Sequence, residues 1–468
     1  MLFPASHTPT WMAGEFPRDA IPGGDDPISF TKPLVDSVRD GSPGGRNDLG
    51  HSPMDVRSTA HSPLKRVAGI ANCVAAVGSA SGQASGSRSL RLLHVVPTYF
   101  PAERYVGPIH SVHGLCKALV RAGHTVDVCT TSVDGSGRLD VPEDLPVNVD
   151  GVCVRYFRSR FDRLYWSPSM SSFLKARTAS YDVLHLHSVY LWPTTSASFW
   201  ATRRKVPYVL APRGMLVPEL IRARSAWIKR CWIAAFERRN LARAALVHLT
   251  SEQELRDLER CGLSAGSTVI VPNGVEVPVH PERRVVAGQI LYLGRLSWKK
   301  NLIPLIQAVA EIPAASLLLA GPDDEGLTAT LIQVADAAGC KDRIRIIGAV
   351  GAEKKRELFA SSECMVLPSL NENFGNVVIE AMANHCPVVL SPGVGARTLV
   401  EACGGGLIAS SGDVEALRNS LCQILGDREA ALAMGAAGGH YVADRLSWDT
   451  VAERMVDAYR GICRRATA

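Results

Sequence analysis

The stretch from residue 367 to residue 382, which reads LPSLNENFGNVVIEAM, constrains the fold of this chain more than any other. Its apolar start predicts the end of a buried strand, and the helical period of its second half predicts a helix after a polar turn. Gly375 lets a ligand approach the backbone, and the free amides at the start of the helix attract an anion. Two carboxylates, Glu372 before the helix and Glu380 within it, have seven residues between them. The stretch therefore predicts a pocket for an anionic ligand that also carries hydroxyl groups.

A second stretch, ILYLGRLSWKKN at residues 290 to 301, predicts a strand and a loop that leads into a helix. Arg295 and Lys300 follow the carboxyl end of that strand, which is where a doubly wound sheet binds phosphates. Arg supplies a bidentate fork and Lys a point charge, so the pair can balance a diphosphate without a metal. Isolated Arg and Lys side chains are usually solvated surface. The glycine before Arg295 and the helix after Lys300 favour the phosphate-binding interpretation.

These two motifs together resemble the donor site of the retaining glycosyltransferases of family 4, which have the GT-B fold. The resemblance covers about residues 90 to 465. It implies an α/β architecture of two Rossmann-like, doubly wound domains that face a central cleft. It also implies a nucleotide-diphosphate sugar as donor, with a UDP- or GDP-sugar favoured, and a glycan or lipid-linked acceptor. The first half is similar to bacterial enzymes that build exopolysaccharide or lipid-linked glycans.

The resemblance also assigns roles to individual residues. Glu372 would bind hydroxyls of the donor sugar, and Glu380 would bind the ribose. Arg295 and Lys300 would bind the diphosphate and, with Glu372, form the catalytic group. The backbone around the helix start would hold sugar and diphosphate through Asn373, Phe374, Gly375 and Asn376.

We expect no cofactor. No Asp-x-Asp metal motif stands near a predicted strand end, so we also expect a metal-independent reaction. The departing phosphate oxygen would take the acceptor's proton on the same face of the sugar, which retains the anomeric configuration.

The first half of the sequence opens with a strand at residues 91–97, a loop, a helix at 109–122 and a strand at 125–130. This order predicts a right-handed βαβ unit with a ligand crevice at the strand's carboxyl end. The family has a glycine pair in that loop; Val106 replaces one member and Gly107, assigned to the donor side, keeps the other. The absence of Gly-x-Gly-x-x-Gly after the strand argues against a nicotinamide dehydrogenase.

Polar residues also end two further predicted strands, at residues 182–187 and 206–214. His187 lies where the first of these leaves the sheet, so it is either a substrate contact or a structural histidine. Arg213 occupies a position where much of the family has a histidine. Arg cannot act as a general base near neutral pH, although it can bind phosphate or carboxylate. We assign both residues to the acceptor or sugar side.

Length and composition indicate how the chain is divided. With 468 residues it is longer than one core usually supports, so we expect two domains and additional material. We predict a disordered extension at 1–88, an acceptor domain at 89–278, a nucleotide-sugar domain at 279–445 and a closing helix at 446–468 that crosses back. The first of these is rich in Pro, Gly, Ser and Asp and lacks a sustained period.

The cellular location is predicted from three features. The 12 cysteines are scattered without CxxC pairs, as is typical of a reducing cytosol. No apolar run reaches the roughly 18 residues of a membrane span. Residues 65–77 imitate a secretory signal but lie far from Met1, so we interpret them as part of a tail or of an upstream stretch that is not translated. We expect a cytoplasmic protein.

Residues 221–245 form a basic helical pattern with interleaved tryptophans. Such a pattern favours contact with an anionic membrane surface, on the inner face of the cytoplasmic membrane, and the protein would then be peripheral. A helix that packs its apolar side on the core and leaves a solvated basic face explains the pattern equally well. No nucleic-acid partner is expected, since the net charge of +6 is mild.

Two other functional classes stay open. A non-catalytic protein of the same fold that binds sugar nucleotides or glycans would keep the architecture and lose a donor residue, but all four charged donor residues are present. A phosphorylase or a nucleotide-sugar epimerase is the other class. A phosphorylase of the glycogen type needs a pyridoxal lysine site, which the sequence does not suggest, and an epimerase would use its donor without an acceptor.

Overall fold

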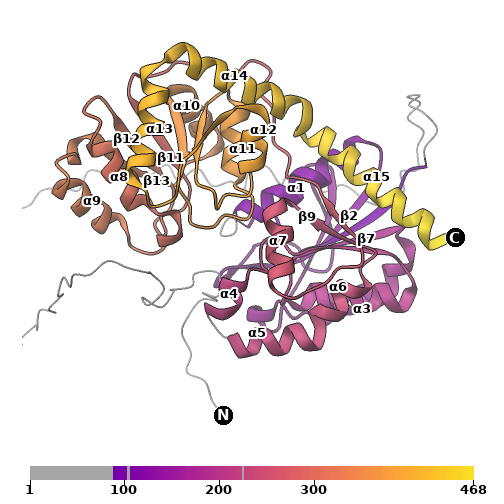
Figure 1. The fold of residues 1–468 in the computed structure, drawn as a ribbon. Helices are drawn as coiled ribbons and strands as arrows, with labels where there is room; N and C mark the ends of the chain where they lie inside the picture. Colours follow the sequence, from indigo (N-terminus) through magenta and orange to yellow (C-terminus); the bar gives the residue numbers. More distant parts are fainter. Residues whose placement is uncertain (1–87, 103–105, 224–225, 468) are drawn as a thin grey trace, which may run out of the picture. The chain divides into compact units, whose positions relative to one another are not determined.

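The computed structural model describes residues 88–102, 106–223 and 226–467. Apart from residue 88, the predicted disordered extension lies outside the described residues, as does the signal-like stretch at residues 65–77. The described part of the chain forms an eight-stranded sheet, a six-stranded sheet and a two-stranded ribbon. Helices accompany both large sheets (Figure 1).

The eight-stranded sheet has the strand order β10-β9-β8-β7-β1-β2-β6-β5. Neighbouring strands are parallel except β5 and β6, which pair antiparallel at one edge. The chain order changes direction at β1, between β2 and β7, and ligands bind at the carboxyl ends of strands beside such a switch point. The strands are β1 (Arg91–Val95), β2 (Thr125–Thr131), β5 (Pro146–Val149), β6 (Val152–Phe157), β7 (Val183–His187), β8 (Tyr208–Ala211), β9 (Leu246–Leu249) and β10 (Thr268–Ile270).

The predicted βαβ opening is confirmed, with a helix that begins three residues earlier than expected. Strands β7 and β8 are buried throughout, as expected where helices cover both faces of a parallel sheet. The pair β5 and β6 and the ribbon of β3 (Val133–Asp134) and β4 (Gly137–Arg138) were not predicted. The helices of this half are α1 (Val106–Arg121), α2 (Pro168–Arg177), α3 (Trp192–Arg204), α4 (Pro218–Ala223), α5 (Ala226–Trp232), α6 (Arg238–Arg243) and α7 (Glu252–Arg260).

The six-stranded sheet is parallel throughout, in the order β13-β12-β11-β14-β15-β16. Its switch point lies between β11 and β14, and these are the strands that the two donor motifs follow. The strands are β11 (Gln289–Leu293), β12 (Ser316–Ala320), β13 (Ile344–Gly348), β14 (Cys364–Leu367), β15 (Val388–Leu390) and β16 (Gly406–Ile408). The helices are α8 (Leu302–Ala310), α9 (Thr328–Ala337), α10 (Ala352–Ser361), α11 (Asn376–Ala383), α12 (Arg397–Cys403), α13 (Val414–Gly426) and α14 (Arg428–Arg445).

The last helix, α15 (Trp448–Thr467), shares a hydrophobic core with the first sheet and runs beside α1 (Figure 1). Trp448 packs against two glycines. A Cβ at Gly114 would lie 2.3 Å from its indole ring, and one at Gly274 would lie 2.5 Å from it. The indole therefore depends on both positions having no side chain. The predicted domain boundaries remain predictions.

Candidate active site

The donor loop, residues 368–375, connects β14 to α11 as the sequence predicts. Gly375 has a φ of 89°, a left-handed conformation that favours glycine, and α11 begins at the next residue. The first amides of α11 have no acceptor within the helix, so they are available to an anion. Phe374 is buried in the core, which leaves only its backbone to face a ligand.

The loop after β11 brings a cation to this place. Lys300 ends a short 3₁₀ turn, Trp298–Lys300, and its ammonium forms an ion pair with the carboxylate of Glu372. The two side chains are only 17% and 27% exposed, so water screens the pair weakly. Arg295 is half-exposed and lies 3.8 Å from Asp324. The structure thus joins Lys300 to Glu372 and leaves the guanidinium of Arg295 half-exposed beside Asp324.

Lys299 is a third cation at this loop, and sequence reasoning missed it. Burial lowers the pKa of Lys299, and the charge of Glu372 opposes that shift. Its backbone carbonyl accepts a hydrogen bond from the amide of Leu370 at 2.9 Å, which ties the two loops together. The doublet of lysines in the sequence was the available signal.

Glu380 lies on α11 and accepts a hydrogen bond from Lys355 Nζ at 3.0 Å. Both side chains are about one-third exposed. Lys355 comes from α10 and was not predicted, because nothing in its local sequence distinguishes it from other exposed lysines. The ion pair holds the Glu380 carboxylate while leaving it accessible to hydroxyls.

The segment after β15 supports the donor loop from behind. The amide of Glu372 donates to Gly393 O and the amide of Gly395 donates to Glu372 O, both at 2.9 Å. A Cβ at Gly393 would lie 2.2 Å from Leu370 O, and one at Gly395 would lie 2.0 Å from Asn373 O. Both positions therefore need glycine. The sequence alone assigned no role to this segment.

Residues of the first half meet the donor loop and the start of α11 through hydrogen bonds. Asn376, the first residue of α11, donates from Nδ2 to Ser111 Oγ at 3.0 Å and to Gly107 O at 3.3 Å. A Cβ at Gly107 would meet no atom within 4 Å, so open space lies beside it. Asn373 donates from Nδ2 to Thr250 Oγ1 at 3.0 Å, and this amide is engaged by the protein itself.

His187 belongs to a group of buried imidazoles at the carboxyl ends of the first sheet. Strand register places His94 beside His185, and His187 lies 3.0 Å from His94. The side chain of His187 is 2% exposed, and its Nδ1 receives hydrogen bonds from Arg213 at 3.3 and 3.2 Å. In this position His187 supports Arg213, which fits a structural histidine better than a substrate contact.

Two chains of hydrogen bonds assign the tautomers of these rings. Arg213 can only donate, so His187 Nδ1 accepts and its Nε2–H donates to His94. In the second chain His248 Nε2 donates to Val271 O at 2.9 Å. His248 Nδ1 therefore accepts from His185, whose Nδ1 in turn accepts from the hydroxyl of Tyr459.

All four imidazoles are consequently neutral, and burial is the first cause that lowers the pKa of each. One nitrogen from each of His94, His185 and His187 lies within 4.8 Å of the others, a set that could hold a metal ion. The hydrogen-bond chains engage every nitrogen of these three rings except His94 Nε2, and the guanidinium of Arg213 adds a positive charge beside them. The arrangement favours hydrogen-bonded imidazoles over metal ligands.

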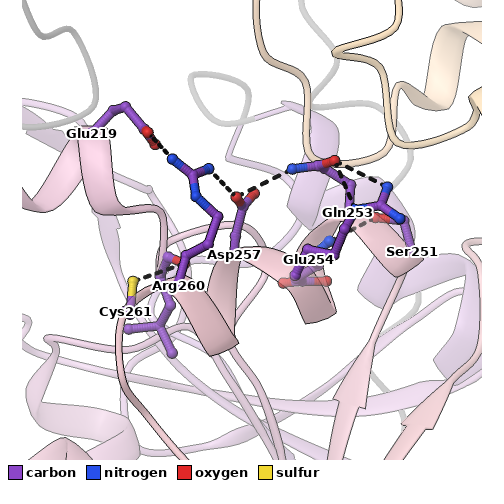
Figure 2. Close-up of polar contacts among 9 residues, drawn as sticks. Glu219, Ser251, Gln253, Glu254, Asp257, Arg260 and Cys261 are labelled. Carbon is purple, nitrogen blue, oxygen red and sulfur yellow. Dashed lines mark hydrogen bonds and ion pairs between the residues drawn. The ribbon is translucent and has the colours of Figure 1, made fainter.

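A buried carboxylate at the start of α7 fixes the turn that carries Arg213. Glu254 Oε1 accepts from the amide of Gly214 at 2.6 Å, and Oε2 accepts from the amide and hydroxyl of Thr250 at 2.8 and 2.9 Å. Ser251 caps the same helix, and Figure 2 shows both residues beside the ion pairs that Arg260 forms further along α7. The spacing Ser-x-x-Glu is that of a capping box and was the signal for Glu254 in the sequence.

The basic segment at 221–245 is helical over most of its described length, as predicted: α4, α5, a π-helical turn at Ile233–Glu237 and α6. Three large apolar side chains are exposed there: Trp227 at 72%, Ile228 at 48% and Phe236 at 38%. Arg230, Arg238 and Arg239 are exposed on the same helices, whereas Glu237 is buried. Among the described residues, no helix is both long and apolar enough to span a bilayer.

Two family models match the sequence, one in each half. The glycosyl transferase 4-like domain matches residues 106–274, and glycosyl transferases group 1 match residues 284–440. These matches contain Gly107 and Arg213 in the first half and the donor motifs in the second half.

Curated relatives of the chain are glycosyltransferases as well. The chain is 29% identical over 180 residues to a D-inositol 3-phosphate glycosyltransferase of Corynebacterium urealyticum, covering 36% of this chain and 42% of that protein, so less than half of the relative is spanned. It is 26% identical over 398 residues to an uncharacterized glycosyltransferase of Methanocaldococcus jannaschii, covering 76% of this chain and 95% of that protein.

A solved structure has a similar fold. HepE of Anabaena, solved in complex with UDP and glucose, matches with a TM-score of 0.62 at 17% identity, over 80% of this chain and 100% of that chain. The GT-B fold class expected from the sequence is confirmed. With its two matching family models and these relatives, the chain belongs to the GT-B glycosyltransferases of the family 4 type.

Proposed function

We propose that the protein transfers a hexose from a nucleotide-diphosphate sugar to a glycan or lipid-linked acceptor in bacterial polysaccharide synthesis, with retention of configuration and without a metal. The observation that carries the proposal is the ion pair of Lys300 and Glu372 beside the start of α11. Anabaena HepE, which has also been solved with UDP-glucose, supports a UDP-sugar as donor.

The donor diphosphate would lie against the cations after β11 and the first amides of α11. As the bond between sugar and phosphate breaks, negative charge grows on the leaving diphosphate. Arg295, Lys299 and Lys300 stabilise that charge more strongly in the transition state than in the ground state. This preference lowers the barrier without a protein nucleophile.

The two glutamates would orient the donor. Glu372, held by Lys300, accepts hydrogen bonds from sugar hydroxyls, and Glu380, held by Lys355, accepts them from the ribose. The leaving phosphate oxygen takes the proton of the acceptor hydroxyl on the face from which it departs, which gives retention. Arg213 cannot accept that proton, because a guanidinium has no acceptor atom at neutral pH.

A donor panel tests this function. The protein is incubated in EDTA with UDP-, GDP- and ADP-sugars, and release of free nucleotide is followed for the wild type, Glu372→Ala and Arg295→Ala. Without an acceptor, water takes the sugar as the nucleotide leaves. We expect such release from one donor, with loss in both variants. Arg284→Ala, at an exposed site paired with Glu282, should match the wild type.

Release that requires a divalent metal would contradict the metal-independent mechanism. A protein that binds nucleotide, but neither releases it from any donor nor transfers sugar to any acceptor, would favour the alternative of a non-catalytic sugar-nucleotide-binding protein. The presence of all four charged donor residues argues for the enzyme.

We also infer that α5 and the π-helical turn contact an anionic membrane surface from the cytoplasmic side. Trp227 and Phe236 expose apolar area beside Arg230 and Arg238, a combination that suits the headgroup region. Each arginine near such a surface contributes about 1 kcal/mol. This surface would bring the enzyme to a lipid-linked acceptor.

Vesicle sedimentation checks the inference. Binding is expected with vesicles that contain phosphatidylglycerol, to be absent with pure phosphatidylcholine, and to fall roughly tenfold in Trp227→Ala, since burial of one such ring contributes about 1.5–3 kcal/mol when complete. Phe199→Ala on α3, where the ring is 58% exposed, is the matched control. Equal binding by both variants would exclude α5 as the contact.

A further inference from the structure

Arg213 has a positive charge that its protein surroundings leave without a counterion. Its guanidinium donates to His187 Nδ1 and, at 2.9 Å, to Asn273 Oδ1. Both acceptors are neutral. These contacts use three of the five N–H donors of a guanidinium, so two donors remain for another partner.

Glu254 is the carboxylate whose charge acts on the pKa of Arg213, but its oxygens are already engaged. Oε1 of Glu254 accepts from the amide of Gly214, and Oε2 accepts from the amide and hydroxyl of Thr250. Within the part of the chain that the structure describes, no carboxylate forms an ion pair with Arg213. Burial lowers the pKa of Arg213, which reports the cost of keeping this charge away from water.

Arg213 is held in an unfavourable backbone conformation. Its φ of 57° is left-handed, a conformation that costs a non-glycine residue about 1 kcal/mol or more. The hydrogen bond from Gly214 to Glu254 and the support of His187 maintain it. A charged side chain held in a strained conformation, without a counterion, is prepared for a ligand.

One chain of contacts connects the guanidinium of Arg213 to the start of α11. Arg213 binds Asn273, and Asn273 Nδ2 donates to Asn376 Oδ1 at 2.8 Å, at the first residue of α11. Arg213 follows β8 of the first sheet, whereas Arg295 and Lys300 follow β11 of the second sheet, so these cations come from two different sheets.

We propose that Arg213 binds a carboxylate or phosphate group of the substrate other than the donor diphosphate. The inference rests on the proposed function and adds a substrate class: either the transferred sugar is a uronic acid, or the acceptor carries an anion near its reacting hydroxyl. Both sources present anionic oxygens that a guanidinium recognises in the same bidentate way.

Calorimetry with paired probes separates the two sources. UDP-glucuronate has a carboxylate at C6 where UDP-glucose has a hydroxymethyl group, so this pair tests whether the anion belongs to the transferred sugar. Glucose 1-phosphate and methyl glucoside, titrated in the presence of UDP, test the acceptor. Each pair is measured on the wild type, on Arg213→Gln, and on Arg284→Gln as the exposed control.

We expect the wild type to bind one anionic probe about ten- to hundredfold more tightly than its neutral counterpart, as for hydrogen bonds to a charged group. Arg213→Gln should abolish that preference, and Arg284→Gln should keep it. Circular dichroism reports whether Arg213→Gln keeps its fold. The folded variant should bind UDP as tightly as the wild type, and a loss of UDP affinity in it would place Arg213 at the donor diphosphate and overturn the proposal. Equal affinities for both pairs in a wild type that binds UDP, or a preference that survives in Arg213→Gln, would overturn this proposal alone. A wild type that does not bind UDP would overturn the donor site itself.

Discussion

Lys300→Met is expected to lower the rate of nucleotide release by about 10²–10³-fold, the range for removing one preorganised charge partner of a transition state. The change removes a cation from the leaving diphosphate. It also leaves the carboxylate of Glu372 only about one-quarter exposed and without its ion pair. That unpaired negative charge would then repel the charge that grows on the phosphate.

Because the two side chains act as one unit, their effects should not add. Glu372→Gln keeps hydrogen-bonding atoms near the sugar and removes the charge. The double variant should therefore be little slower than Lys300→Met alone. Rates are measured with saturating donor, so that a change in affinity is separated from a change in turnover.

Lys341→Met is the matched control, since it breaks an ion pair with Asp336 in which both side chains are more than half exposed. Such pairs contribute little, so its rate should equal that of the wild type. If Lys300→Met and Lys341→Met release nucleotide equally fast, the assignment of Lys300 to the diphosphate is wrong.

The buried imidazoles give the second large effect, on stability. His94 and His248 have pKa values lowered by burial to about 3, against 6.5 for an unburied imidazole. Both rings are neutral in the folded and unfolded states at pH 8. Below pH 6.5 the unfolded chain binds protons that the folded chain refuses, so stability is present above the unfolded pKa and is lost as pH falls toward 3.

The magnitude follows from linkage. Each such imidazole changes the free energy of unfolding by about 1.4 kcal/mol per pH unit within that window. From pH 6 to pH 5, His94 and His248 together are expected to remove about 2–3 kcal/mol, a large part of the 5–15 kcal/mol typical of a folded protein. His185 and His187, whose pKa values are also lowered, add to the slope.

Urea unfolding at pH 7, 6 and 5, followed by tryptophan fluorescence, measures this slope. His94→Asn keeps an acceptor for His187 and cannot titrate, so it should reduce the slope by the share of one histidine. His280→Asn, at an exposed position, should leave the slope unchanged. Identical slopes in the two variants would show that His94 is not a neutral buried ring.

Local sequence signals predicted the two donor motifs well. The turn at Gly375 and the loop that carries Arg295 and Lys300 follow from residue types within a few positions of each other, and the strand and helix around each were found. The fold class is confirmed. The roles of the individual side chains stay predictions.

Contacts between distant segments could not be predicted. Gly393 and Gly395 matter because their segment packs against a loop about 20 residues earlier, a distance over which one sequence gives no register. The tautomers at His185 and His187 depend on Arg213, in the turn after β8, and on Tyr459, in the last helix.

The central claim, that the cations after β11 and the start of α11 form a nucleotide-diphosphate site, is tested most directly by calorimetric titration of UDP. We predict binding to the wild type, weakened at least tenfold in Arg295→Ala and in Lys300→Met, as expected for loss of a charge-assisted hydrogen bond. Arg284→Ala should bind like the wild type. If UDP binds neither variant more weakly than the wild type, or does not bind the wild type, the claim is wrong.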